Sequence, residues 1–165
     1  MKKTLLVLSL LVLFFLISAK NFLASNLSAC HEGNLLEEGH RAYELLNSIS
    51  PVEGIKICTL ERGSKSYVAV NSFNGVWLIL MSTHTLTFSD NALKGAFAHE
   101  LGHIHVNFGQ IWRSNEEREL GDQEADAFAI RLVGPEALLE TYIAHTGDEE
   151  LAKRRVKRAL NLFPE

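Results

Sequence analysis

Two histidines four residues apart, His99 and His103, are the feature that most restricts how this chain can fold. In an α-helix such a pair lies one turn apart on one face, so both imidazoles can reach a single metal ion. Glu100, beside the first histidine, can reach a water molecule at that metal without binding the metal itself. The roughly opposite face is apolar: Phe97, Leu101 and Ile104. We therefore expect a helix that buries its apolar side and presents the histidines to a cleft.

The His-Glu-x-x-His spacing predicts one catalytic zinc ion per chain. Residue frequencies alone would produce this pattern in about one chain in a hundred of this length. Here the pattern also lies in the middle of an amphipathic helix, which favours a functional site over a chance match. A catalytic zinc ion needs a third protein ligand as well, with an open position for water.

An acidic segment downstream, residues 116–126, offers that third ligand. Asp122 and Asp126 are four residues apart and would share a helical face. One carboxylate could bind the metal, and the other could accept an N–H from a histidine ligand. Spacing alone does not separate Asp122 from Glu124 as the ligand. The remaining acids fit a solvated charged face: Glu116, Glu117 and Glu119.

The body of the chain has the pattern of a helix, a small antiparallel sheet and then more helices, which predicts an α+β fold. The first helix has apolar residues at helical spacing up to Ile49 and ends before Pro51. Runs of β-forming residues predict three strands, Ile55–Leu60, Tyr67–Asn71 and Val76–Met81, with a hairpin turn at Asn74-Gly75. The later helices are expected at Ala92–Val106 (N-cap Ser89 or Asp90), about Glu116–Val133, Glu136–His145 and Asp148–Leu162, with a break at Gly134-Pro135.

The N-terminal segment has the pattern of a targeting element. Lys2 and Lys3 precede an unbroken apolar run from Leu5 to Ile17. This order is typical of a secretory signal peptide or an apolar anchor helix, with a buried core helix as the alternative. We therefore expect residues 1–29 to be a signal peptide or membrane anchor and residues 30–165 to be the folded domain. The basic head predicts export of that domain to a periplasmic or extracellular face.

Cys30 has three alternative fates. Leu27-Ser28-Ala29-Cys30 resembles a bacterial lipobox, in which the cysteine would carry a lipid and make the chain a membrane lipoprotein. A disulfide with Cys58, which is the only other cysteine, would form in an oxidising compartment. Two free thiols are the third alternative, and the sequence does not choose among them.

The folded domain is acidic. The whole chain has 16 Lys and Arg against 20 Asp and Glu. Three lysines and no acids lie in residues 1–29, so residues 30–165 have 13 basic and 20 acidic residues, a formal charge of −7. Phosphate backbones would repel such a domain, which excludes nucleic acid as an expected partner.

Three landmarks resemble the HtpX/BepA-like zinc peptidases, which are relatives of the CAAX prenyl proteases: Asn71-Ser72-Phe73, Ala98–His103 and Glu124-Ala125-Asp126. The resemblance covers roughly Tyr67 to Leu138. The segment from Glu124 to Pro135 is also similar to the ImmA/IrrE-like metallopeptidases. Both families place the third ligand four residues before the Asp or Asn. That register falls on Asp122, where both families normally have Glu.

The resemblance implies a gluzincin-like zincin domain with zinc metalloendopeptidase activity. The implied ligands are His99, His103 and Asp122, with Glu100 as catalytic base and Asp126 orienting a ligand imidazole. The protein or peptide substrate would lie as an extended strand along the sheet edge near Tyr67–Met81. The aspartate at position 122 leaves a second hypothesis open, a degenerate protein that binds zinc or clients without cutting them. Three residues are weaker candidates for an oxyanion donor: Tyr142, His145 and Arg154.

Overall fold

The computed structural model describes residues 30, 34–50, 53–60, 68–73, 76–106 and 114–162. The chain divides into two units, Met1–Leu35 and Leu36–Glu165, and the helices and strands named below all belong to the second. The predicted signal or anchor helix at residues 1–29 lies outside the described part. Within the described part, no helix is long and apolar enough to cross a bilayer. Cys30 and Cys58 are each disulfide-bonded, so neither cysteine is a free thiol.

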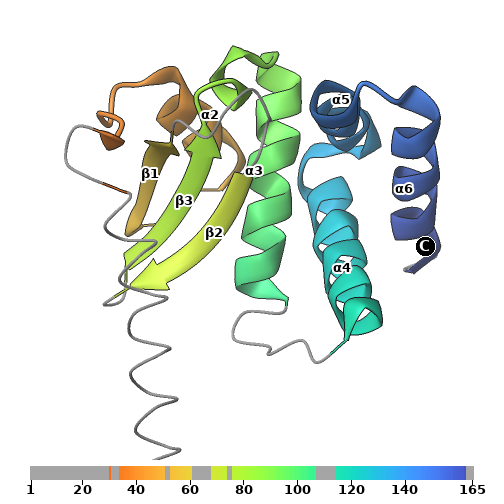
Figure 1. The fold of residues 1–165 in the computed structure, drawn as a ribbon. Coiled ribbons are helices and arrows are strands. Elements are labelled where there is room, and N and C mark those ends of the chain that lie inside the picture. Colours follow the sequence, from red (N-terminus) through yellow and green to blue (C-terminus); the bar gives the residue numbers. More distant parts are fainter. Residues whose placement is uncertain are drawn as a thin grey trace, which may run out of the picture. The chain divides into compact units, whose positions relative to one another are not determined.

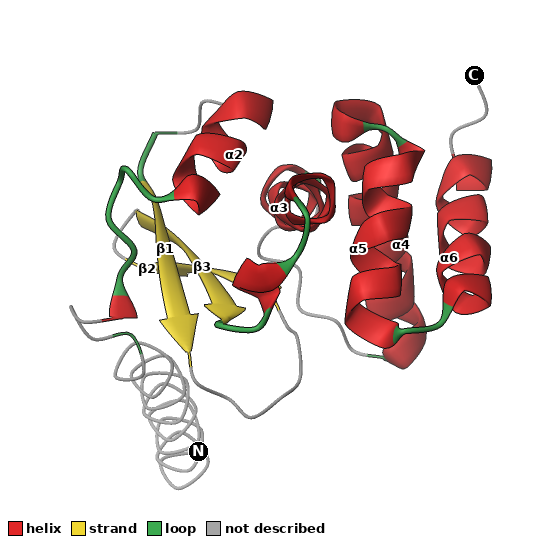
Figure 2. Cartoon of the chain, turned by 90° about the horizontal axis from the view of Figure 1, so that it is seen from above, coloured by secondary structure: helices red, strands yellow, loops and turns green. Residues whose placement is uncertain are grey.

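The second unit combines a three-stranded sheet with α-helices, which confirms the predicted α+β class (Figure 1). In chain order its elements are α2 (Arg41–Ile49), β1 (Ile55–Leu60), β2 (Val68–Phe73), β3 (Val76–Ser82), the 3₁₀ turn η2 (Thr85–Thr87), α3 (Asp90–His105), α4 (Asn115–Val133), α5 (Pro135–Thr146) and α6 (Glu149–Leu162). Helix α3 lies between the sheet on one side and α4 and α5 on the other, with α6 outermost (Figure 2).

The sheet is mixed, so the prediction of a purely antiparallel sheet is wrong. Strand β3 lies in the centre, in the order β1-β3-β2. Phe73 pairs with Val76 across the predicted hairpin. Only two residues connect β2 to β3, and such a short connection requires the two strands to run antiparallel. Strand β1 pairs with the other side of β3 in parallel, with Ile57 opposite Ile79. No local turn connects β1 to β3, so sequence pattern could not set the direction of this pair.

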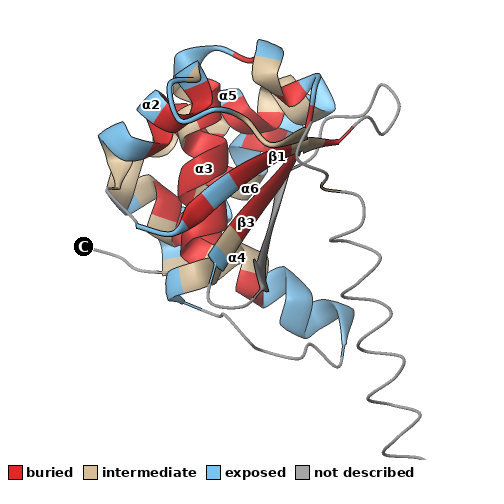
Figure 3. Cartoon of the chain, turned by 90° about the vertical axis from the view of Figure 1, so that its left-hand side faces the viewer, coloured by how far each residue is buried: buried red, intermediate tan, exposed pale blue. Residues whose placement is uncertain are grey.

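Helix α3 is stabilised by a cap at its N-terminus and by burial of its apolar face. The Ser89 side chain caps it by accepting the Ala92 N–H at 3.1 Å. Phe97 and Leu101 are fully buried, as expected from the apolar face, and much of α3 is buried while the first turns of α4 are exposed (Figure 3). The core cluster around α3 contains residues from the sheet and α2, including Leu46, Ile57 and Ile79.

Gly102 sets the distance between α3 and α4. A Cβ atom added there would lie 2.7 Å from the Cα and 2.8 Å from the carbonyl oxygen of Ala125. Real side chains do not make contacts this short, so only glycine allows the two backbones to approach this closely. Gly102 lies next to His103, and Ala125 lies next to Asp126. The close approach therefore brings the histidine helix and the acidic helix together.

Two glycines with positive φ fold the last helices back onto α4. Gly134, with φ of 88°, ends α4, and Pro135 begins α5 in its first turn. Gly147, with φ of 69°, ends α5 in the left-handed conformation. These three helices and α3 then share a second core cluster: Ala98, Ala129, Leu138, Tyr142, Ala152 and Val156. This packing carries side chains of α5 and α6 to the histidine face of α3.

Candidate metal centre

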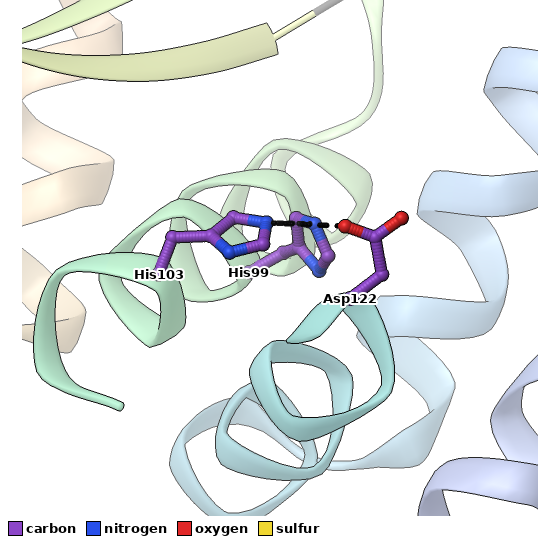
Figure 4. Close-up of side chains that lie close together, drawn as sticks. All are labelled: His99, His103 and Asp122. Carbon is purple, nitrogen blue, oxygen red and sulfur yellow. Dashed lines mark hydrogen bonds and ion pairs between the residues drawn. The ribbon is translucent and has the colours of Figure 1, made fainter. Parts of the chain in front are cut away.

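Helices α3 and α4 bring together three side chains that could hold a metal ion, His99, His103 and Asp122. The Nε2 atoms of the two histidines are 3.1 Å apart. The Asp122 Oδ1 atom lies 3.6 Å from His103 Nε2, and the three donor atoms are all within 4.8 Å of one another. In Figure 4 both imidazoles lie at the face of α3 that meets the Asp122 carboxylate on α4. The histidine side chains are 15% exposed and Asp122 is 37% exposed, so the site is open on one side.

The donor set suits a divalent metal ion such as zinc in its chemistry, and two of its three donor separations suit such an ion in size. Zinc bonds of about 2.0–2.2 Å in a tetrahedral arrangement place neighbouring donor atoms about 3.3 Å apart. The two measured separations, 3.1 and 3.6 Å, lie on either side of that value. Two imidazole nitrogens and one carboxylate oxygen also leave the fourth position free. The same set suits other divalent first-row metals, so the geometry supports a metal site without choosing zinc.

The Asp126 carboxylate is hydrogen-bonded to Nδ1 of His99, the ring nitrogen that does not face His103. The carboxylate is fully buried, and its Oδ1 atom lies 2.7 Å from His99 Nδ1. An ionised carboxylate can only accept a hydrogen bond. Nδ1 of His99 therefore carries the ring proton and donates the hydrogen bond to Asp126. The lone pair of this ring then lies on Nε2, the atom that faces His103. Asp126 therefore fixes both the tautomer and the orientation of one candidate ligand.

Asp126 is itself held by two donors from α5 and α6. The Tyr142 hydroxyl donates to Oδ1, and Arg155 Nε donates to Oδ2 at 2.8 Å. The Arg155 guanidinium also lies 4.2 Å from the centre of the Tyr142 ring and 3.9 Å from Asp122 Oδ2. Every polar group of this buried cluster thus has a partner, as a buried carboxylate requires.

The charges in this cluster shift the pKa values of its members. Burial alone would raise the pKa of Asp126, but the hydrogen bond and charge of His99, together with Arg155, lower it. Burial alone would lower the pKa of His99, but the hydrogen bond and charge of Asp126 raise it. Burial and then the Asp126 charge raise the pKa of Tyr142 well above its usual value. Asp126 is accordingly an anion and Tyr142 a neutral donor near neutral pH.

Arg155 is the residue of this cluster that sequence pattern did not indicate. It lies 29 residues from Asp126 along the chain, so no helical spacing connects the two. The one sequence feature that could have indicated a buried role for Arg155 is its place on α6 beside the buried positions Ala152 and Val156. Tyr142 was a candidate oxyanion donor, but its hydroxyl is committed to Asp126 instead.

The remaining candidates, and the nearby His105, have different surroundings in the structure. Glu100 is buried, with 5% of its surface exposed, and its charge acts on His99. Glu124 is partly buried and does not belong to the group that could hold a metal. His105 stacks on Phe128 with ring centres 5.3 Å apart, and His145 packs edge-on against Phe88.

Comparison with known proteins does not assign this chain to a family. No family model, curated protein or solved structure matches it. The resemblances noted in the sequence therefore stay predictions, and the functional inference below rests on the residues of the candidate metal centre.

Proposed function

We propose that this chain is a zinc-dependent endopeptidase of the gluzincin-like zincin type. The observation that carries the proposal is the meeting of His99, His103 and Asp122 within 4.8 Å on two packed helices, with Glu100 next to the first ligand. The resemblance to the HtpX/BepA-like peptidases supports the same assignment. Glu100 is then the catalytic base, and Asp126 is the positioning residue for His99.

A bound zinc ion would supply an acidified water molecule and polarise the scissile carbonyl. Glu100 accepts a proton from the attacking water and delivers it to the leaving amine. Asp126 keeps the Nε2 lone pair of His99 directed at the site. Tyr142 and Arg155 keep Asp126 in place by donating to its two oxygens.

The edge of the sheet supplies a place for an extended substrate. Strand β2 is at the edge of the sheet, and no further strand pairs with its outer side in the described residues. The same strand contacts α3, the helix that carries both histidines. A peptide that added to β2 by backbone hydrogen bonds would gain affinity with loose side-chain preference. This fits proteins with unfolded segments as the substrate class.

The direct test combines metal analysis with hydrolysis. Purified chain should hold close to one zinc ion, and His99→Ala and His103→Ala should each lose it. The zinc-loaded chain should cleave casein, and a chelator should stop the cleavage. Elemental analysis that finds no zinc in chain purified without chelator would contradict the proposal.

The third ligand can be tested separately. We expect Asp122→Ala to lose most of its zinc, because Asp122 is the one carboxylate that belongs to the candidate group. Glu124→Ala is the matched control and should retain zinc. Asp122→Glu should keep the metal, because it restores the side chain usual in the resembled families. Equilibrium dialysis against zinc would contradict the assignment if Glu124→Ala lost the metal and Asp122→Ala kept it.

The second hypothesis is a degenerate protein that holds zinc or clients without cutting them. It is favoured by the aspartate at position 122, whose side chain is shorter than glutamate by one methylene, about 1.5 Å. Against it, the Asp122 carboxylate already lies 3.6 Å from His103 Nε2, so the shorter side chain reaches the site. Casein that binds the zinc-loaded chain but is never cleaved would favour this alternative.

We also propose that the folded domain acts outside the cytoplasm, on the strength of the basic head and the apolar run in residues 1–29. Protease added to spheroplasts that express the chain should therefore digest the domain. The same protease added to intact cells, with their outer barrier closed, is the control. Full protection in spheroplasts, with digestion only after lysis, would contradict export.

A further inference from the structure

A pocket of about 270 Å³ lies beside the candidate metal centre. Its walls come from α4, α5 and α6, and it shares Asp122 and Tyr142 with the cluster described above. Three arginines of α6 line it: Arg154, Arg155 and Arg158. Anything bound in this pocket would therefore lie next to the group that could hold the metal.

One of the three arginines has no described ion-pair partner, although Glu119 and Asp122 also line the pocket. Arg155 forms an ion pair with Asp126, to which its Nε donates at 2.8 Å. Arg158 donates to Glu119 at 2.7 Å in an exposed pair. Arg154 is exposed and also lines the pocket, and its side chain has no hydrogen bond or ion pair with a described residue. When Asp122 binds a metal ion, its charge is engaged by that ion as well. An anionic ligand is thus the chemistry that this wall favours.

The volume of the pocket and its other lining residues restrict the kind of ligand that fits. Pockets that hold drug-sized ligands or cofactors typically measure about 300–1,000 Å³, so this one is small enough to suit a side chain or a chain end. Leu151 and Ala152 supply apolar surface beside the arginines. The exposed pair of Arg158 with Glu119 is weak enough to open, which would free a second guanidinium for a planar carboxylate.

We propose that this pocket is a substrate subsite that binds a carboxylate of the peptide, with Arg154 as its main anchor. The carboxylate could be that of an acidic side chain or that of a free C-terminus, since both present the same group to a guanidinium. This inference rests on the proposed peptidase function and names the substrate feature that the same site would prefer.

The test measures binding without cleavage, on the zinc-loaded Glu100→Gln chain. Three fluorescein-labelled hexapeptides share one sequence: a neutral amidated peptide with Gln at one position, the amidated peptide with Glu there, and the Gln peptide with a free C-terminal carboxylate. Fluorescence anisotropy should show that at least one acidic peptide binds about tenfold more tightly than the neutral one, as one charge-assisted contact predicts. Which of the two binds more tightly identifies the source of the carboxylate.

Arg154→Gln in the same background should remove most of that preference. Lys157→Gln is the matched control, because Lys157 is exposed on the same helix, carries the same charge and does not line the pocket. It should keep the preference. Equal binding of the three peptides, no binding of any, or equal losses in both variants would overturn the proposal.

The two proposals fail in different ways. If wild type cleaves casein but the three peptides bind equally, the subsite is wrong and the peptidase function stands. If casein is never cleaved but the Arg154-dependent preference is observed, the carboxylate site stands and the peptidase function falls.

Discussion

Replacing Glu100 by Gln should slow peptide hydrolysis by about 10²–10⁴-fold while leaving zinc and fold unchanged, as expected when a general base is removed. The substitution keeps the size of the side chain, which matters because Glu100 is only 5% exposed. It removes the group that accepts the proton from water but none of the candidate metal ligands. Rates of casein cleavage, zinc content and urea unfolding of the two proteins are the measurements.

Glu124→Gln is the control for that experiment. It makes the same chemical change on α4, outside the group that could hold a metal. Its activity should stay within about twofold of wild type, because Glu124 supplies no atom to that group and a substitution away from a functional feature typically has a small effect. Cleavage at the wild-type rate by Glu100→Gln would show that Glu100 is not the base and would remove the proposed mechanism.

Replacing Asp126 by Ala should destabilise the metal-free protein by about 1–3 kcal/mol for each buried donor that loses its acceptor. The carboxylate is fully buried and accepts hydrogen bonds from His99, Tyr142 and Arg155. Without it these donors lose their acceptor inside the protein. Zinc affinity should also fall by about 10–100-fold, because His99 would lose the group that orients it. Urea unfolding of the apo-protein and zinc titration measure the two effects.

Asp122→Ala gives the contrast. Asp122 is 37% exposed, so its loss should change the stability of the apo-protein little while removing a candidate metal ligand. The role of Asp126 as a buried positioning residue would be wrong if the two variants lost equal stability.

The stability of the protein in acid should also depend on the Asp126 carboxylate. Because the pKa of Asp126 is lowered in the folded protein, its contribution to stability is fully present above the unfolded value of about 3.9. It is lost as the pH falls from there through the lower folded value. Urea unfolding between pH 5 and pH 2 should therefore show a smaller acid-dependent loss in Asp126→Ala than in wild type.

The sequence by itself determined those parts of the protein that local spacing controls. The hairpin of β2 and β3, the capped start of α3 at Ser89 and the Gly134-Pro135 break between α4 and α5 all lie close to their predicted positions. These features depend on turn residues, caps and helical periodicity, which act over a few residues. The same local periodicity put His99 and His103 on one face of a single helix.

Only the tertiary structure decided which side chains of other helices contact the histidine face of α3. The contact of Gly102 with Ala125 sets how close α3 and α4 come, and this distance brings Asp122 within 3.6 Å of His103. The parallel pairing of β1 with β3 and the donation from Arg155 to Asp126 join residues far apart in the chain. Such contacts depend on how whole helices and strands pack. The pattern around any single residue does not encode them. Spacing could propose the histidine pair and a supporting Asp126, but not the donors that hold Asp126 in place, Tyr142 and Arg155.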